Sequence, residues 1–144
     1  MHTTAQTIKK VFTTSIISAT LLCSGLVSAH QDAEHQSQLE QAIAGEHRSE
    51  KNKARDEFRH PKETLAFFGF KPSMTVVEIT PGGGWYTEIL APALKGKGKL
   101  YGAHYPDTGE DNYYSNSRKK LVEKLASDPV FSEVELTNFI PREE

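Results

Sequence analysis

The stretch TVVEITPGGGWYTEIL, residues 75–90, constrains the fold more than any other part of this chain. Residues 75–79 are β-branched and apolar except for one acid, which predicts a short strand. Three glycines follow after two residues, and residues 85–94 then carry apolar side chains at helical spacing. A strand, a glycine turn and a helix bring bare backbone N–H groups to the carboxyl edge of a sheet. We therefore predict an α/β fold with a ligand site at this turn.

Residues 1–29 have the pattern of a secretory signal peptide. A lysine pair precedes a mostly apolar run over residues 11–27, and a Val-Ser-Ala sequence then suits cleavage after Ala29. An uncleaved membrane anchor is one alternative, which the shortness of the run and its serines and threonines disfavour. A lipid anchor on Cys23 is another, which Leu22 disfavours because a small residue is usual there. We expect a periplasmic or secreted protein with no membrane contact after cleavage.

Composition excludes several classes of function. The chain has 144 residues, a net charge of −2 and 25% charged residues, with no basic stripe that would favour nucleic acid. Cys23 is the one cysteine and lies in the signal segment, so the exported chain would form no disulfide and no thiolate metal site. Three histidines, at positions 30, 35 and 47, lack metal-ligand spacing on a defined element. We predict no metal site.

Residues 30–60 predict a polar segment of one or two surface helices, because their apolar stripe is thin. Four of their polar side chains fall three or four apart and would share one helix face: Arg48, Asn52, Arg55 and Arg59. This face is either solvated and crossed by ion pairs, or it packs near the ligand pocket and presents Arg55, Asp56 or Arg59 to it.

Residues 61–144 alternate between helices and strands. A helix over residues 61–68 ends at Gly69, and a further helix starts at a cap on Ser115 or Ser117. The remaining strands are expected over residues 99–103 and 134–139. This order predicts a Rossmann-like parallel sheet of about three strands, right-handed crossovers and helices on both faces.

Three parallel strands make half of a doubly wound sheet. We therefore expect an incomplete domain, from a truncated gene product or a fragment, that is marginally stable alone. The open edge of the first strand is a hazard for self-association.

The glycine turn also discriminates between nucleotides. A dinucleotide fingerprint requires Gly-x-Gly-x-x-Gly, and Thr87 stands where the third glycine is needed. A phosphate-binding P-loop requires a Gly-Lys-Ser/Thr ending, which the turn lacks. S-adenosylmethionine is the ligand that remains.

Residues 48–103 resemble a family of exported class I S-adenosylmethionine-dependent methyltransferases. The matching motifs are His47-Arg48-Ser49, Arg55-Asp56, Arg59-His60-Pro61, Leu65-Ala66-Phe67-Phe68-Gly69, Lys71-Pro72 and Pro81-Gly82-Gly83-Gly84-Trp85-Tyr86-Thr87-Glu88. The resemblance covers the N-terminal half of the family's domain. It implies an incomplete class I methyltransferase fold with S-adenosylmethionine as cofactor.

The resemblance also implies a set of cofactor-binding residues: Glu78, Thr80, Pro81, Gly82, Gly83, Gly84 and His104. Glu78 would hold the methionine amino group, and the glycine backbone would lie against the ribose and the sulfonium. Thr80 replaces the first glycine of the family pattern. His104 stands near the position of an acid that takes both ribose hydroxyls, and an imidazole cannot accept both bonds. The motifs identify neither catalytic residues nor a methyl acceptor.

Two functions remain open. The chain is either a methyltransferase, or its cofactor-binding half, or else a non-catalytic periplasmic binding or interaction module that keeps the turn without the chemistry.

Overall fold

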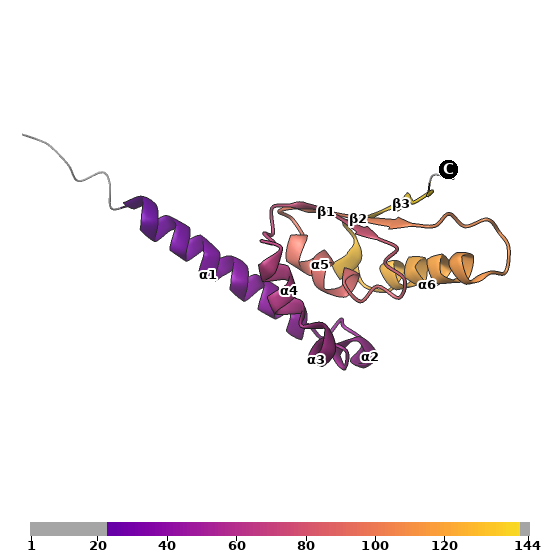
Figure 1. Ribbon diagram of the computed structural model, residues 1–144, viewed down its shortest axis with the longest axis horizontal. Coiled ribbons are helices and arrows are strands. Elements are labelled where there is room, and N and C mark those ends of the chain that lie inside the picture. The colour runs from indigo at the N-terminus through magenta and orange to yellow at the C-terminus, as the bar shows by residue number, and fades with distance from the viewer. Residues whose placement is uncertain (1–22, 142–144) are drawn as a thin grey trace, which may run out of the picture.

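The computed structural model describes residues 23–141, with side chains from residue 33 onward. The elements, in chain order (Figure 1), are α1 (Cys23–Ala44), α2 (Glu50–Lys53), α3 (Asp56–Arg59), α4 (Pro61–Phe67), β1 (Thr75–Ile79), α5 (Thr87–Leu94), β2 (Lys99–His104), α6 (Tyr113–Ser127), the 3-10 helix η1 (Pro129–Phe131) and β3 (Val134–Asn138). Most of the predicted signal peptide lies outside the described residues, and Ala29 lies within α1. None of the helices in the described part has the length and apolarity needed to cross a membrane.

The three strands form one parallel sheet in the order β1-β2-β3. Val77 of β1 lies beside Tyr101 of β2, and Tyr101 lies beside Glu135 of β3. The prediction of a Rossmann-like, three-stranded parallel sheet with flanking helices is confirmed.

Among the described residues, 23–141, the helices cover one face of the sheet, which corrects the prediction of two covered faces. Both crossovers advance in the same direction, from β1 to β2 and from β2 to β3. Right-handed crossovers that advance in one direction put their helices on one side, and a second layer needs the strand order to reverse. Figure 1 shows α5 and α6 beneath the strands. On the other face, Val77 is 55% exposed and Ile79 is 60% exposed.

The core lies between the sheet and α5. Ile89 and Leu94 of α5 are fully buried, with Leu100 of β2 against them. The helix α1 packs across α5 and α4, and it contributes Leu39 and Ala42 to this core. A thin apolar stripe is therefore enough to dock α1, as the sequence predicted for a helix laid on a larger body.

Two details of the helices depart from the sequence predictions. The chain after α1 forms two single-turn helices, α2 and α3, so the four side chains expected on one continuous helix face do not share one. The helix α6 is capped by Asn112 instead of Ser115 or Ser117, because the Asn112 side chain accepts a hydrogen bond from the Ser115 N–H at 2.9 Å. The predicted end of α4 is confirmed, since Gly69 has a φ of 65°.

Candidate functional site

The glycine turn joins β1 to α5 through three residues with positive φ. Thr80, Gly82 and Gly84 have φ values of 49°, 57° and 75°. The turn closes with a hydrogen bond of 2.9 Å from the Gly84 N–H to the Pro81 carbonyl. Because threonine seldom adopts a positive φ, Thr80 is a strained position, and such positions gather at ligand-binding turns.

Gly84 and Gly83 are glycines for different reasons. A Cβ on Gly84 would lie 3.2 Å from Lys124 Cδ and 3.3 Å from Leu121 Cδ1, so α6 packs directly on the turn. A Cβ on Gly83 would meet nothing within 4 Å, and its φ is not in the positive range. The fold therefore requires glycine at position 84, whereas the described residues leave room for a side chain at position 83.

One cavity, of about 250 Å³, opens beside the turn at the carboxyl ends of β1 and β2. We call it the tyrosine cavity, and its lining residues are Thr80, Gly82, His104, Tyr105, Tyr113, Tyr114 and Ser117. The rings of Tyr105 and Tyr114 lie 4.3 Å apart between centroids. Three of the predicted site residues, Thr80, Gly82 and His104, thus meet in one cavity although 24 positions separate the first from the last.

His104 is buried in the wall of the tyrosine cavity, and both of its ring nitrogens have partners. Nδ1 lies 3.2 Å from the Tyr105 carbonyl and Nε2 lies 3.2 Å from Ser117 Oγ. Because a carbonyl only accepts, Nδ1–H donates to it and Nε2 accepts from the serine hydroxyl. Burial lowers the pKa of His104, the Arg118 charge lowers it further, and the bond to the Tyr105 carbonyl opposes both. Both ring nitrogens are therefore satisfied within the protein, and the lowered pKa favours the neutral ring.

Glu78 lies apart from the tyrosine cavity. Its Oε2 accepts a hydrogen bond of 2.6 Å from Thr87 Oγ1, which ties the end of β1 to the first residue of α5. Burial raises the pKa of the Glu78 carboxyl to about 7, while the Thr87 hydrogen bonds and the Arg59 charge act in the opposite direction. The predicted site is thus divided between two cavities.

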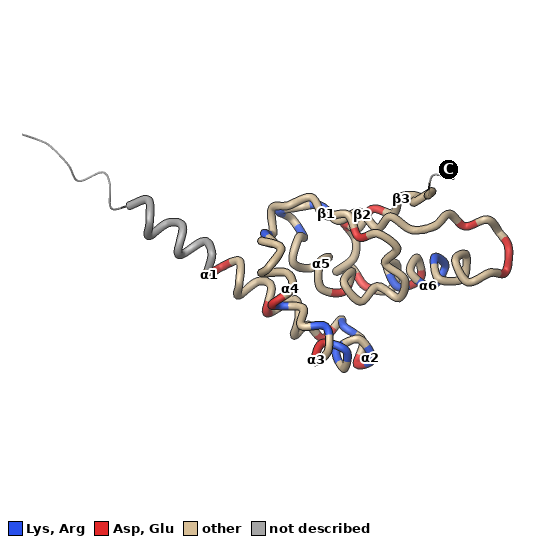
Figure 2. Tube along the Cα trace, in the orientation of Figure 1, with Lys and Arg blue, Asp and Glu red and all other residues tan. Residues whose placement is uncertain are grey.

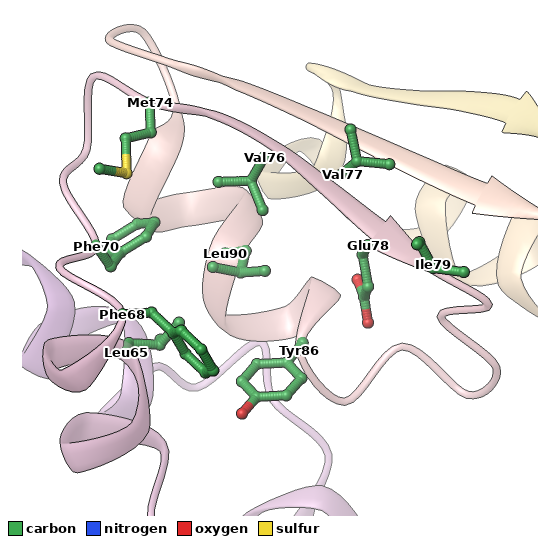
Figure 3. A pocket seen from close by; sticks show the side chains of 10 residues that line it. All are labelled: Leu65, Phe68, Phe70, Met74, Val76, Val77, Glu78, Ile79, Tyr86 and Leu90. Carbon is green, nitrogen blue, oxygen red and sulfur yellow. The ribbon is translucent and has the colours of Figure 1, made fainter.

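The second cavity, which we call the edge cavity, has a volume of about 390 Å³ and lies along β1 (Figure 3). Its lining residues are Leu65, Phe68, Phe70, Met74, Val76, Val77, Glu78, Ile79, Tyr86 and Leu90. Figure 3 shows the Glu78 carboxylate as the one acidic group among these apolar and aromatic side chains. Residues from both faces of β1 line it, so this cavity wraps around the outer edge of the strand.

A cluster of charged side chains packs beside the turn, and its members are Arg48, Asp56, Glu88 and Lys124. Arg48 donates to both carboxylate oxygens of Asp56, at 2.6 and 2.8 Å. Its Nε lies 3.9 Å from Oε2 of Glu88, whose other oxygen accepts from Lys124 and Ser49. Arg48 and Glu88 are both buried. The cluster therefore joins the N-terminal segment, α5 and α6 around the turn.

These contacts show that neither alternative holds for all of the charged residues in the segment 46–60. The solvated-face alternative is wrong for Arg48, which is buried, and Asp56 faces Arg48 instead of a ligand pocket. Arg59 stacks on the aromatic residues that follow the glycines, with its guanidinium carbon 4.3 Å from the Trp85 ring centroid and 5.4 Å from that of Tyr86. Arg55 is exposed.

The roles of several site residues could not be recognised in the sequence. Glu88 falls at a helix position whose neighbours are all buried, and only the packing of α6 shows that Lys124 reaches it. Tyr105 follows β2 in a loop of no regular pattern. Figure 2 shows acidic and basic residues of the described chain interspersed, and within residues 33–141 no three histidine, cysteine or acidic side chains group as metal ligands.

Comparisons of the chain with protein-family models, with curated proteins and with solved structures found no match.

Proposed function

We propose that this chain binds S-adenosylmethionine at the glycine turn, as a class I methyltransferase-like protein. One observation carries the proposal. Thr80, Gly82 and His104 converge on the tyrosine cavity at the carboxyl ends of two neighbouring parallel strands. This is the edge at which open α/β sheets bind nucleotide-like ligands. Tyr105 and Tyr114 add aromatic faces on which an adenine ring can stack.

The size of the tyrosine cavity suits part of the ligand. Its volume of about 250 Å³ is below the usual range for a whole small-molecule site, about 300–1,000 Å³. The nucleoside would therefore occupy the cavity, and the sulfonium and methionine portion would lie along the turn over Gly83. The open space at the Gly83 Cα supports this path, because it leaves the backbone free for close approach.

Glu78 would hold the methionine ammonium group. A cation near a buried carboxyl favours its ionised form, so binding would lower the pKa of Glu78 from about 7 and release a proton. Binding should then release more protons to buffer below pH 7 than above it. S-adenosylmethionine supplies an electrophilic methyl group, and the chain's contribution would be to hold an acceptor in line with it.

A second candidate is a binding module without transferase activity. The observation that favours it is the state of His104, whose two ring nitrogens are both engaged within the protein. A ribose diol would find no free carboxylate at this position, and the affinity for a nucleoside would be correspondingly weaker.

Isothermal titration calorimetry with S-adenosylmethionine and with its demethylated product tests the proposal on three proteins. The wild type should bind at micromolar concentration, and Glu78→Ala should bind at least tenfold more weakly. Gly83→Ala should also lose affinity while melting at the same temperature, because its added methyl group meets only the ligand. Ser132→Ala, on an exposed residue after η1, is the control and should bind like the wild type. The absence of heat at millimolar ligand would refute the proposal.

A further inference from the structure

The outer edge of β1 is an unpaired strand edge. Within residues 23–141, β2 is the one strand that pairs with β1. The Thr80 N–H donates to the Ala103 carbonyl and the Met74 carbonyl accepts from the Lys99 N–H, so the even-numbered residues direct their backbone groups toward β2. Because the direction alternates along a strand, Thr75, Val77 and Ile79 turn their N–H and C=O groups outward.

Apolar side chains surround this edge on both sides. Val77 and Ile79 are more than half exposed on the open face of the sheet. On the helix side the edge cavity lies along the strand, and Phe68 at its rim is 72% exposed. Phe67, which is 85% exposed, packs on Phe68 with ring centroids 5.4 Å apart. An edge of this kind is a template for pairing with another strand.

The opposite edge of the sheet has different chemistry. Along β3, Glu135 forms an ion pair with Lys99, and Thr137 and Asn138 are exposed. Charged and polar side chains of this kind protect an edge strand from pairing. Association would therefore use the β1 edge of both partners, because a contact between β1 and β3 would pair an apolar edge with a protected one and would continue into an open filament.

We propose that two copies of this chain associate through β1, which pairs antiparallel with β1 of the second copy across a twofold axis at Val77. The two sheets then form one sheet of six strands, and the two edge cavities face each other across the axis. This inference does not rest on the binding of S-adenosylmethionine.

The register follows from the free backbone groups. A twofold axis at Val77 sets Val77 opposite its own copy and Thr75 opposite Ile79 in both directions. All of these residues have outward backbone groups, so about six main-chain hydrogen bonds form, two for each pair. Parallel pairing about a twofold axis fails, because in a parallel ladder the two residues that lie opposite each other cannot both be hydrogen bonded.

The side chains at this interface are self-complementary. On the open face Val77 lies opposite Val77 of the second copy, and Ile79 lies opposite Thr75. None of these side chains is charged. On the helix side Glu78 lies opposite Val76, and Phe68 of each copy lies beside the cavity of the other. Phe68 at the rim of the edge cavity and Phe67 packed on it add exposed aromatic surface beside the strand. This surface would contribute to the roughly 800 Å² per partner that a stable interface needs.

Sedimentation velocity on the full chain from 1 to 100 µM tests the association. The wild type should be dimeric in the upper part of this range. Val77→Lys places two ammonium groups opposite each other and should weaken the dimer at least tenfold. Val122→Lys, on an exposed residue of α6, is the matched control and should leave the dimer intact. A wild type that stays monomeric at 100 µM, or a Val77→Lys variant that dimerises as the wild type does, would overturn the proposal.

A cysteine variant tests the axis itself. In a Cys23→Ser background, Val77→Cys should be joined between the two copies by a short bifunctional thiol crosslinker, because residues opposite each other in a hydrogen-bonded antiparallel pair have Cα atoms about 5.5 Å apart. Thr137→Cys, on the exposed face of β3, should remain unlinked. If the chain is dimeric but Val77→Cys does not crosslink, the twofold axis at Val77 is wrong.

Discussion

Replacing Glu78 by glutamine should stabilise the chain at high pH and leave its stability almost unchanged at low pH. Burial raises the pKa of this carboxyl from 4.5 to about 7, so the folded state holds the proton more tightly than the unfolded state does. The stability that this tighter binding contributes is complete below pH 4.5, and it is lost as the pH rises through 7. One pKa unit corresponds to about 1.4 kcal/mol, so ionised Glu78 should cost up to about 3 kcal/mol above pH 7.

Glutamine removes this cost and keeps the geometry, because its side-chain oxygen can still accept the hydrogen bond from Thr87 Oγ1. Thermal melts of wild type and Glu78→Gln at pH 5 and pH 8 measure the effect. The two proteins should melt within about 2 °C of each other at pH 5, and the variant should melt about 10 °C higher at pH 8. Glu123→Gln, on an exposed residue of α6, controls for the loss of one negative charge.

An equal difference between wild type and Glu78→Gln at both pH values would refute the reasoning. It would mean that the free-energy cost of burying Glu78 does not depend on its ionisation. The pKa of this carboxyl at the end of β1 would then not be raised.

Substitutions at four further positions test the packing around the turn and the cap of α6. Gly84→Ala should lower the free energy of unfolding by about 1–3 kcal/mol, because the φ of Gly84 is positive and α6 crowds the added methyl group. Gly83→Ala should change the free energy of unfolding by less than about 0.5 kcal/mol in the same urea titration. Arg48→Ala leaves Asp56 without its bidentate partner and should cost about 3–5 kcal/mol in urea denaturation, a loss that an unchanged midpoint would contradict. Asn112→Ala removes the α6 cap and should cost about 1 kcal/mol, and Asn112→Asp should restore most of it.

The sheet could be predicted from the sequence because β1 and β3 contain β-branched residues, β2 follows a turn rich in glycine and lysine, and the helices between the strands set them parallel. The one-sided helix layer could also have been deduced, since three strands in simple succession offer no reversal of direction. The helical pattern of residues 46–60 misled the prediction for a physical reason. Arg48 gains more from its buried bonds to Asp56 than from a place on a solvated helix, and this tertiary contact has no periodic signature.

The candidate site was predictable in part for the same kind of reason. Gly82 and Gly84 have positive φ, and glycine is the residue that adopts this conformation most easily. The glycine run therefore predicted the turn. The division of the site was not visible, because Glu78 and Thr80 are two residues apart yet line different cavities. The tyrosine rings of the cavity come from the loop after β2 and from the first turn of α6, and only the fold of that loop brings them to Thr80.

The most direct test of the central claim is the position of the ligand on the chain. Amide spectra of ¹⁵N-labelled protein, recorded during a titration with the demethylated product of S-adenosylmethionine, report that position residue by residue. The amides of Thr80, Gly82, Gly83 and Tyr105 should shift with a common dissociation constant, and those of β3 should stay unchanged. Shifts confined to residues outside the turn and the tyrosine cavity, or no shifts at millimolar ligand, would contradict the account.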